Sequence, residues 1–73
     1  MTFEVMEYIV WIVEVVATEF FNGEKTAAYE ALTSRGLIQA YADNYETTHT
    51  LGREYIVGEI KDCLWTSTAD APC

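Results

Sequence analysis

The feature that most constrains this chain is residues 3–21, a segment that is apolar around most of a helical circumference. When successive residues are placed about 100° apart, its polar arc spans only about 80°. The positions in that arc are Glu4, Glu7, Trp11, Glu14, Thr18 and Asn22. The many β-branched residues would also suit a strand, but the segment is too long for one. We therefore expect a central helix, covered by other elements on most sides or sharing its apolar surface with a second chain.

Three further helices are predicted, over residues 24–35, 37–43 and 50–65, with a polar loop over 45–50. Each shows apolar residues one turn apart, and Gly36 follows the first of them as a glycine C-cap would. The positions expected to face the core are Ala28, Tyr29, Leu32, Ile56, Val57, Ile60, Cys63 and Leu64. In the short helix over 37–43, Leu37/Tyr41 and Ile38/Ala42 are expected to be one-turn neighbours.

Two residues of the last predicted helix carry specific expectations. Thr50 is expected to be its N-cap, because a threonine hydroxyl can accept a hydrogen bond from the first turn. Gly58 lies in its middle, where glycine costs roughly 1 kcal/mol relative to alanine. We interpret Gly58 as a position of close packing against the first helix, and a neutral position without a packing role is the alternative.

A chain of 73 residues, 51% of them hydrophobic, is long enough for one domain and too apolar to be disordered. The predicted fold class is all-α: a single small domain of about four helices over residues 1–65, with the long N-terminal helix central. Residues 66–73 are polar, and we expect them to form a flexible tail.

The charge balance limits the kinds of partner. Twelve acidic and four basic residues give a formal charge of −8, so a basic face for phosphates cannot be assembled. We therefore expect no direct nucleic-acid binding. Glutamates interrupt the apolar N-terminal run and no Lys or Arg precedes Lys25, which argues against a membrane span and against a signal peptide. A soluble protein without a membrane partner is predicted.

The cysteine count bears on the compartment and on cofactors. Cys63 and Cys73 are the two cysteines, and with one histidine they cannot build a zinc site. No metal or other cofactor is predicted. A bridge between them would close a short loop of modest benefit, so we interpret both as reduced thiols of a cytoplasmic protein.

His49 is the one histidine, and it could act as a general base or a metal ligand. No second histidine is near it, and a nucleophile at Thr48, Thr50 or Cys63 would have no evident orienting partner. We favour a structural role, in which the ring packs or hydrogen-bonds at a helix entrance. No catalytic residue is predicted.

Trp11 lies in the middle of the polar arc, where the helical period predicts exposure. Exposed tryptophans are common at the centres of protein interfaces. The alternative is that the loop or the C-terminal tail folds over the indole. The candidate interface residues are Glu4, Glu7, Trp11 and Glu14, whose carboxylates would steer a basic or mixed partner.

Residues 44–57 read NYETTHTLGREYIV. This stretch resembles a family of small bacterial proteins of unknown function that share the pattern Asn-Tyr-Asp/Glu-x-x-His-Thr-x-Gly-x-Glu-Tyr-Ile/Val-Val. The resemblance covers about residues 4–65, and Gly58 departs from it. It implies an all-helical domain with no established activity. Because members are often encoded beside ADP-ribosyltransferase-like proteins, it also implies an antitoxin-like or accessory role.

The residues that match the family pattern either form a functional site or serve to shape the turn. They are Asn44, Tyr45, His49, Thr50, Gly52 and Tyr55. In the turn interpretation Asn44 stops one helix, Thr50 caps the next, and Gly52 permits a close approach.

We predict a non-enzymatic protein-binding module that binds another protein or a second copy of itself as a homodimer. An acidic phage- or plasmid-type inhibitor that mimics nucleic acid and blocks a basic groove is the alternative. A small enzyme centred on His49 is the third hypothesis.

Overall fold

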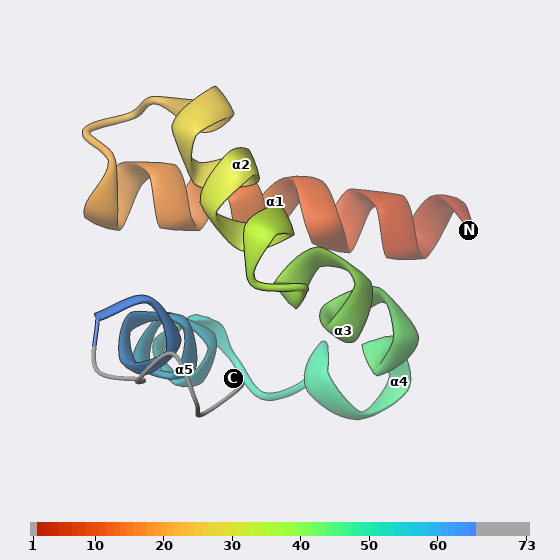
Figure 1. Cartoon of the computed structure of the whole chain (residues 1–73). Helices are drawn as coiled ribbons and strands as arrows, with labels where there is room; N and C mark the ends of the chain where they lie inside the picture. Colours follow the sequence, from red (N-terminus) through yellow and green to blue (C-terminus); the bar gives the residue numbers. More distant parts are fainter. Residues whose placement is uncertain (1, 66–73) are drawn as a thin grey trace.

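The computed structural model describes residues 2–65, which form five helices and no strand (Figure 1). The all-α class is therefore confirmed. The helices are α1 (Phe3–Phe20), α2 (Lys25–Ser34), α3 (Leu37–Asp43), α4 (Tyr45–Thr48) and α5 (Arg53–Trp65). Residues 66–73, with the predicted flexible tail, lie outside the described residues. None of the helices in the described part combines the length and the apolar run needed to cross a membrane.

Helix α1 begins and ends close to where the sequence indicates. The Thr2 hydroxyl accepts a hydrogen bond from the backbone N–H of Val5 at 3.2 Å, which satisfies one donor of the first turn. After Phe20 the chain turns through Asn22, whose φ of 54° lies in the left-handed region. Asn22 and Gly23 both have positive φ, which ends the helix at this point.

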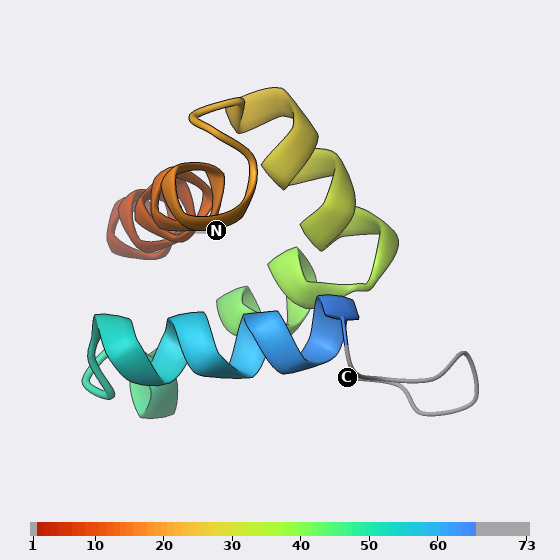
Figure 2. The same ribbon diagram turned by 90° about the vertical axis from the view of Figure 1, so that its left-hand side faces the viewer.

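Helix α1 is central, as predicted. Helices α2, α3 and α5 all pack against it. In Figure 1, α1 runs across the view with α2 crossing in front of it, while α5 is seen end-on. A quarter turn places α5 across the view and α1 nearly end-on (Figure 2), so these two helices cross at a steep angle.

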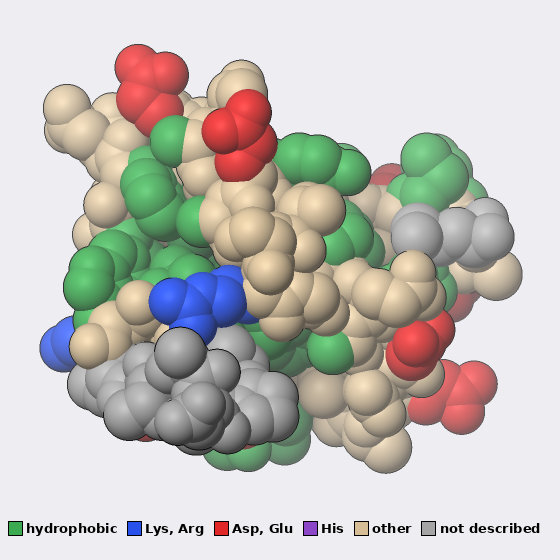
Figure 3. Space-filling model, viewed as in Figure 1, with side chains coloured by type: hydrophobic (Ala, Val, Ile, Leu, Met, Phe, Trp, Pro, Cys, Tyr) green, Lys and Arg blue, Asp and Glu red, His purple; other side chains and the backbone are tan. Residues whose placement is uncertain are grey.

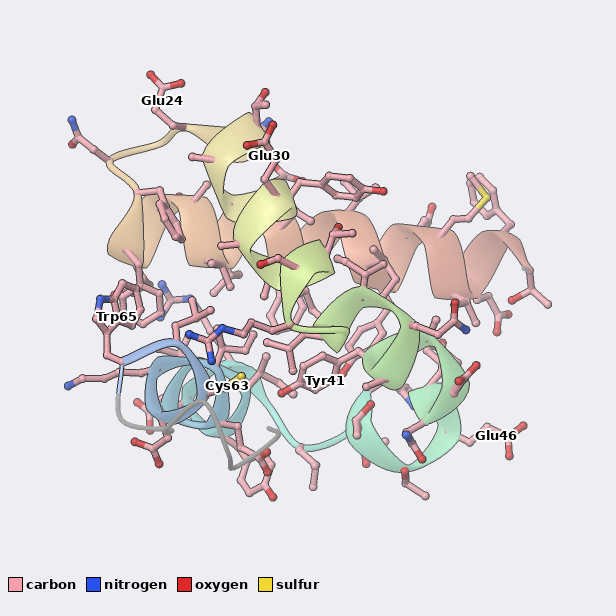
Figure 4. The ribbon with its side chains drawn as sticks, in the orientation of Figure 1. Glu24, Glu30, Tyr41, Glu46, Cys63 and Trp65 are labelled. Atoms are coloured by element: carbon pink, nitrogen blue, oxygen red, sulfur yellow. The ribbon has the colours of Figure 1, made fainter. Side chains whose placement is uncertain are left out.

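The core lies where α1 meets α2 and α5. Ile12 and Val16 are fully buried on α1, and they join side chains from three other helices in one apolar cluster. The other large, fully buried members are Leu32, Ile56 and Ile60. At the far end of α1, the Phe20 ring packs against Trp65 with centroids 4.9 Å apart, below the C-terminal end of α1 in Figure 4. The buried face predicted for α5 is confirmed by the burial of Ile56, Ile60 and Cys63.

Residues 45–48 are helical, which corrects the predicted loop. The threonines that suggest a loop instead close this turn, because the hydroxyls of Thr47 and Thr48 both donate to the carbonyl oxygen of Asn44, at 3.1 and 2.8 Å. Such local bonds let threonine hold a short turn that it would disfavour in a longer helix.

Helix α5 begins at Arg53, so the prediction that Thr50 is its N-cap is wrong. The chain enters the helix through Gly52, whose φ is +90° and whose carbonyl accepts from the N–H of Ile56 at 3.2 Å. A Cβ added at Gly52 would meet nothing within 4 Å. Glycine is required here by backbone conformation and not by a close approach.

Two other expectations about packing are wrong. Tyr29 was expected on the inner face of α2, but it is 50% exposed, because the helix turns Ala28 and Leu32 inward instead. Gly58 was expected to pack closely against α1, but a Cβ added there would meet nothing within 4 Å. Gly58 therefore weakens α5 without a packing gain.

Cys63 is buried on α5 and is disulfide-bonded, not a free thiol. The expectation of a reduced thiol at Cys63 is thus wrong, and Cys73 lies outside the described residues.

We expect Gly58→Ala to raise the free energy of unfolding by about 0.5–1 kcal/mol, because it reduces backbone entropy in the unfolded chain and meets open space in the fold. Gly52→Ala is the matched control and should lower it by about 1–2 kcal/mol, since φ is +90° there. Urea unfolding followed by circular dichroism measures both. A loss of stability in Gly58→Ala would contradict the account of α5.

Candidate functional site

The predicted interface residues all lie on the solvent-exposed side of α1. Glu4, Glu7 and Glu14 are all exposed, and Trp11 is 37% exposed between them. The helical period places all four on one side of α1, as expected. The indole is neither buried by the rest of the described chain nor fully free, so its immediate neighbours decide what this surface can bind.

The neighbour of Trp11 on its own helix is Tyr8. Their ring centroids lie 6.2 Å apart at an interplanar angle of 20°. Tyr8 itself is buried, and it links the exposed indole to the apolar core. The spacing of three residues on one helix could have identified this pair from the sequence.

Two more rings lie near Tyr8: Tyr45 on α4, and His49 at the C-terminal cap of that helix. The ring of Tyr45 stands edge-to-face to that of Tyr8, with centroids 5.3 Å apart at 73°. His49 stacks on Tyr45 with centroids 4.2 Å apart at 10°. His49 Nδ1 lies 2.5 Å from the carbonyl oxygen of Tyr45. Because a carbonyl can only accept, Nδ1 carries the proton and donates. His49 packs and hydrogen-bonds at the end of α4, whereas the sequence predicts such a contact at the entrance of the last helix.

A chain of hydroxyl hydrogen bonds fixes Tyr8 to α4. Its hydroxyl donates to Thr48 Oγ1 at 2.9 Å, and the Thr48 hydroxyl donates to the carbonyl oxygen of Asn44 at 2.8 Å. Burial raises the pKa of Tyr8 above its ordinary value, while the hydrogen bond with Thr48 opposes the rise. The phenol therefore stays protonated and keeps donating over the whole neutral range.

These side chains line a shallow, open hollow with a volume of about 360 Å³ between α1 and α4. We call it the aromatic hollow, and its lining residues are Glu4, Glu7, Tyr8, Trp11, Tyr45 and His49. Glu14 is not among them, and its Oε2 lies 3.7 Å from Lys25 Nζ. The structure thus separates Glu14 from the other two acidic interface candidates.

The family-pattern residues do not form one site. Tyr45 and His49 line the aromatic hollow, whereas Asn44 and Tyr55 line a larger pocket on another side of α4. Thr50 and Gly52 lie in the exposed turn before α5. Part of the pattern therefore shapes the turn, and part of it supplies side chains to the hollow.

The larger pocket has a volume of about 660 Å³ and lies between α3, α4 and α5. Tyr41 lies between α3 and α5 (Figure 4) and lines it together with Tyr55 and Glu59. Burial, and next the charge of Glu59, raise the pKa of Tyr41 well above its ordinary value of 10.0. A hydrogen bond with Glu59 and the charge of that carboxylate raise the pKa of the exposed Tyr55. These groups favour neutral phenols and build no evident nucleophile.

Within residues 2–65, no group of three or more His, Cys, Asp or Glu side chains is placed to hold a metal ion. The hydrogen bonds of His49 and Tyr8 go to the Tyr45 carbonyl and to the Thr48 hydroxyl, as described above. What the site offers is ring faces and carboxylates, which suit binding of a cationic group.

Comparisons with protein-family models, with curated proteins and with solved structures find no match for this chain. The resemblance to the small bacterial family stays a prediction.

We expect the stability of the protein to fall as the pH rises above about 10, because unfolding lets the Tyr41 phenol ionise at its ordinary pKa of 10.0 while the folded state keeps it protonated. The contribution is complete below pH 10 and is lost as the pH approaches the raised folded pKa. Tyr41→Phe should flatten this decline in thermal melts between pH 9 and 11. Tyr29→Phe, which removes an exposed phenol, is the control and should leave the slope unchanged.

Proposed function

We propose that this protein is a non-enzymatic protein-binding module whose docking surface is the acidic side of α1 around Trp11. The observation that supports it best is a 37% exposed tryptophan between three exposed glutamates on the central helix. An exposed, well-supported tryptophan is a typical interface anchor, and surrounding charge selects the partner and speeds encounter. The partner on this proposal is a protein with a basic docking region.

The chemistry of the site supports a binding role over an enzymatic one, because the Tyr8 hydroxyl and His49 Nδ1 are both occupied in holding the rings. The role we propose is that of an antitoxin-like or accessory partner of a bacterial effector, in the cytoplasm. It rests on the family resemblance and on the acidic charge of −8.

A second surface of α1 supports self-association as a homodimer. Phe3, Met6 and Val10 follow one another at one-turn spacing and are 73%, 51% and 56% exposed. We call them the apolar stripe. Figure 3 shows hydrophobic side chains at the surface near the N-terminal end of α1. A continuous exposed stripe of this kind is typical of a contact between chains.

To test the docking surface, we expect Trp11→Ala to reduce capture of the partner from the source cell by about tenfold or more, as the loss of an interface anchor does. Trp65→Ala is the matched control. It removes a tryptophan that is 54% exposed at the other end of the fold, and it should leave capture unchanged. Circular dichroism of both variants checks that the helices stay folded.

An equal loss of partner capture in the two tryptophan variants would contradict the docking surface, because nonspecific hydrophobic binding by exposed indoles would then explain the capture. Competition of DNA or RNA with the protein for its captured target would favour the nucleic-acid mimic instead.

For self-association, we expect sedimentation equilibrium to show a dimer that Val10→Glu converts to a monomer, because a carboxylate in the apolar stripe would be buried without a partner. Thr18→Glu adds the same charge at another exposed position of α1 and should leave the dimer intact. A wild-type monomer at high concentration would contradict the homodimer and would leave the proposal of a heterologous partner standing.

A further inference from the structure

We propose that the aromatic hollow binds an arginine side chain of the partner protein. The inference rests on the proposed function, and it names the chemical group that the acidic side of α1 recognises. Its basis is the juxtaposition of four rings and two carboxylates in one open hollow of about 360 Å³.

The rings form a corner and not a flat surface. Tyr8 and Trp11 lie nearly parallel, at 20°, and Tyr45 and His49 lie nearly parallel, at 10°. The two pairs meet where Tyr8 stands at 73° to Tyr45. Because Tyr8 is buried and His49 covers one face of Tyr45, a planar cation in this corner can place its face on the exposed ring of Trp11 or of His49. Tryptophan is the strongest of the aromatic partners for a cation.

Glu4 and Glu7 also line the hollow, on the α1 side. Glu14 pairs with Lys25 and Glu19 pairs with Arg53, and neither of these ion pairs involves Glu4 or Glu7. Two carboxylates beside ring faces favour a cation and disfavour an anion, by the sign of the charges alone.

Arginine fits this arrangement better than lysine. A guanidinium group is planar, stacks on aromatic faces and donates five N–H bonds in a fixed fork to carboxylates. His49 lines the hollow and is stacked on Tyr45, so its ring offers a flat face to the guanidinium plane. A lysine ammonium would keep most of its hydration in so open a hollow and would use the flat rings less well.

The hollow is organised before any ligand binds. The hydrogen bond from Tyr8 to Thr48 fixes one ring pair to α4, and the bond from His49 to the Tyr45 backbone fixes the other. Rings held in place lose little entropy when a ligand arrives, which favours affinity for a small group.

The test uses three peptides that differ in one side chain: acetyl-Gly-Arg-Gly-amide, its citrulline analogue and its lysine analogue. Citrulline keeps the shape of arginine without the charge. Titration of the full chain is followed by NMR, through the indole N–H of Trp11 and the ring of His49. We expect the arginine peptide to bind at least about fivefold more tightly than the citrulline peptide, and more tightly than the lysine peptide.

Two glutamate variants distinguish binding in the hollow from nonspecific attraction to the acidic surface of α1. Glu7→Gln should weaken binding of the arginine peptide by roughly fivefold, because it removes a lining carboxylate. Glu14→Gln removes the same charge from the same helix but outside the hollow, and it should change binding less than twofold. Equal losses in the two variants, equal binding of arginine and citrulline, or no binding of the arginine peptide would overturn the inference.

The result is distinguishable from failure of the proposed function. Suppose that the partner is captured through Trp11 but the arginine peptide does not shift the NMR signals of Trp11 and His49. The docking surface then stands and the arginine assignment is wrong. If the peptide binds as expected but Trp11→Ala leaves capture unchanged, the assignment stands and the proposed docking surface is wrong.

Discussion

Burial of α1 by the rest of a very short chain is the interaction on which this structure depends. Ile12 and Val16 are completely covered, and that cover comes from α2, α3 and α5 together. A chain of 73 residues has little other apolar surface to bury, so the central helix organises the whole core. The later helices are short and are stabilised mainly through their contacts with it.

The same helix also supplies the candidate site, because its two exposed faces are what the other helices leave uncovered. Tyr8 connects the two roles. Its ring packs in the core cluster, stacks beside Trp11, and is hydrogen-bonded to α4 through Thr48. The orientation of the exposed indole is therefore tied to the packing of the fold, and a binding event at Trp11 would act on a rigid element. Rigid support of this kind is what a docking residue needs to be selective.

The parts of the fold that were predicted correctly are those in which local pattern and burial agree. The length of α1 follows from its apolar run over residues 3–21. The errors occur at residue types that have two possible local roles, so that the sequence alone does not choose between them. The threonines of residues 45–48 suggest a loop but bond back to Asn44, and Gly58 suggests a close contact that no neighbouring helix makes.

The amino-acid order was enough to establish a helical protein built on an apolar first helix, with Trp11 and its glutamates turned to solvent, because helical periodicity is a local property. It could not show that Tyr45 and His49 stand beside Trp11, since that contact joins segments more than thirty residues apart. Only the docking of α4 against α1 makes the hollow, and it divides Glu4 and Glu7 from Glu14. Contacts between distant segments depend on how whole helices pack, and no local pattern of residues encodes that arrangement.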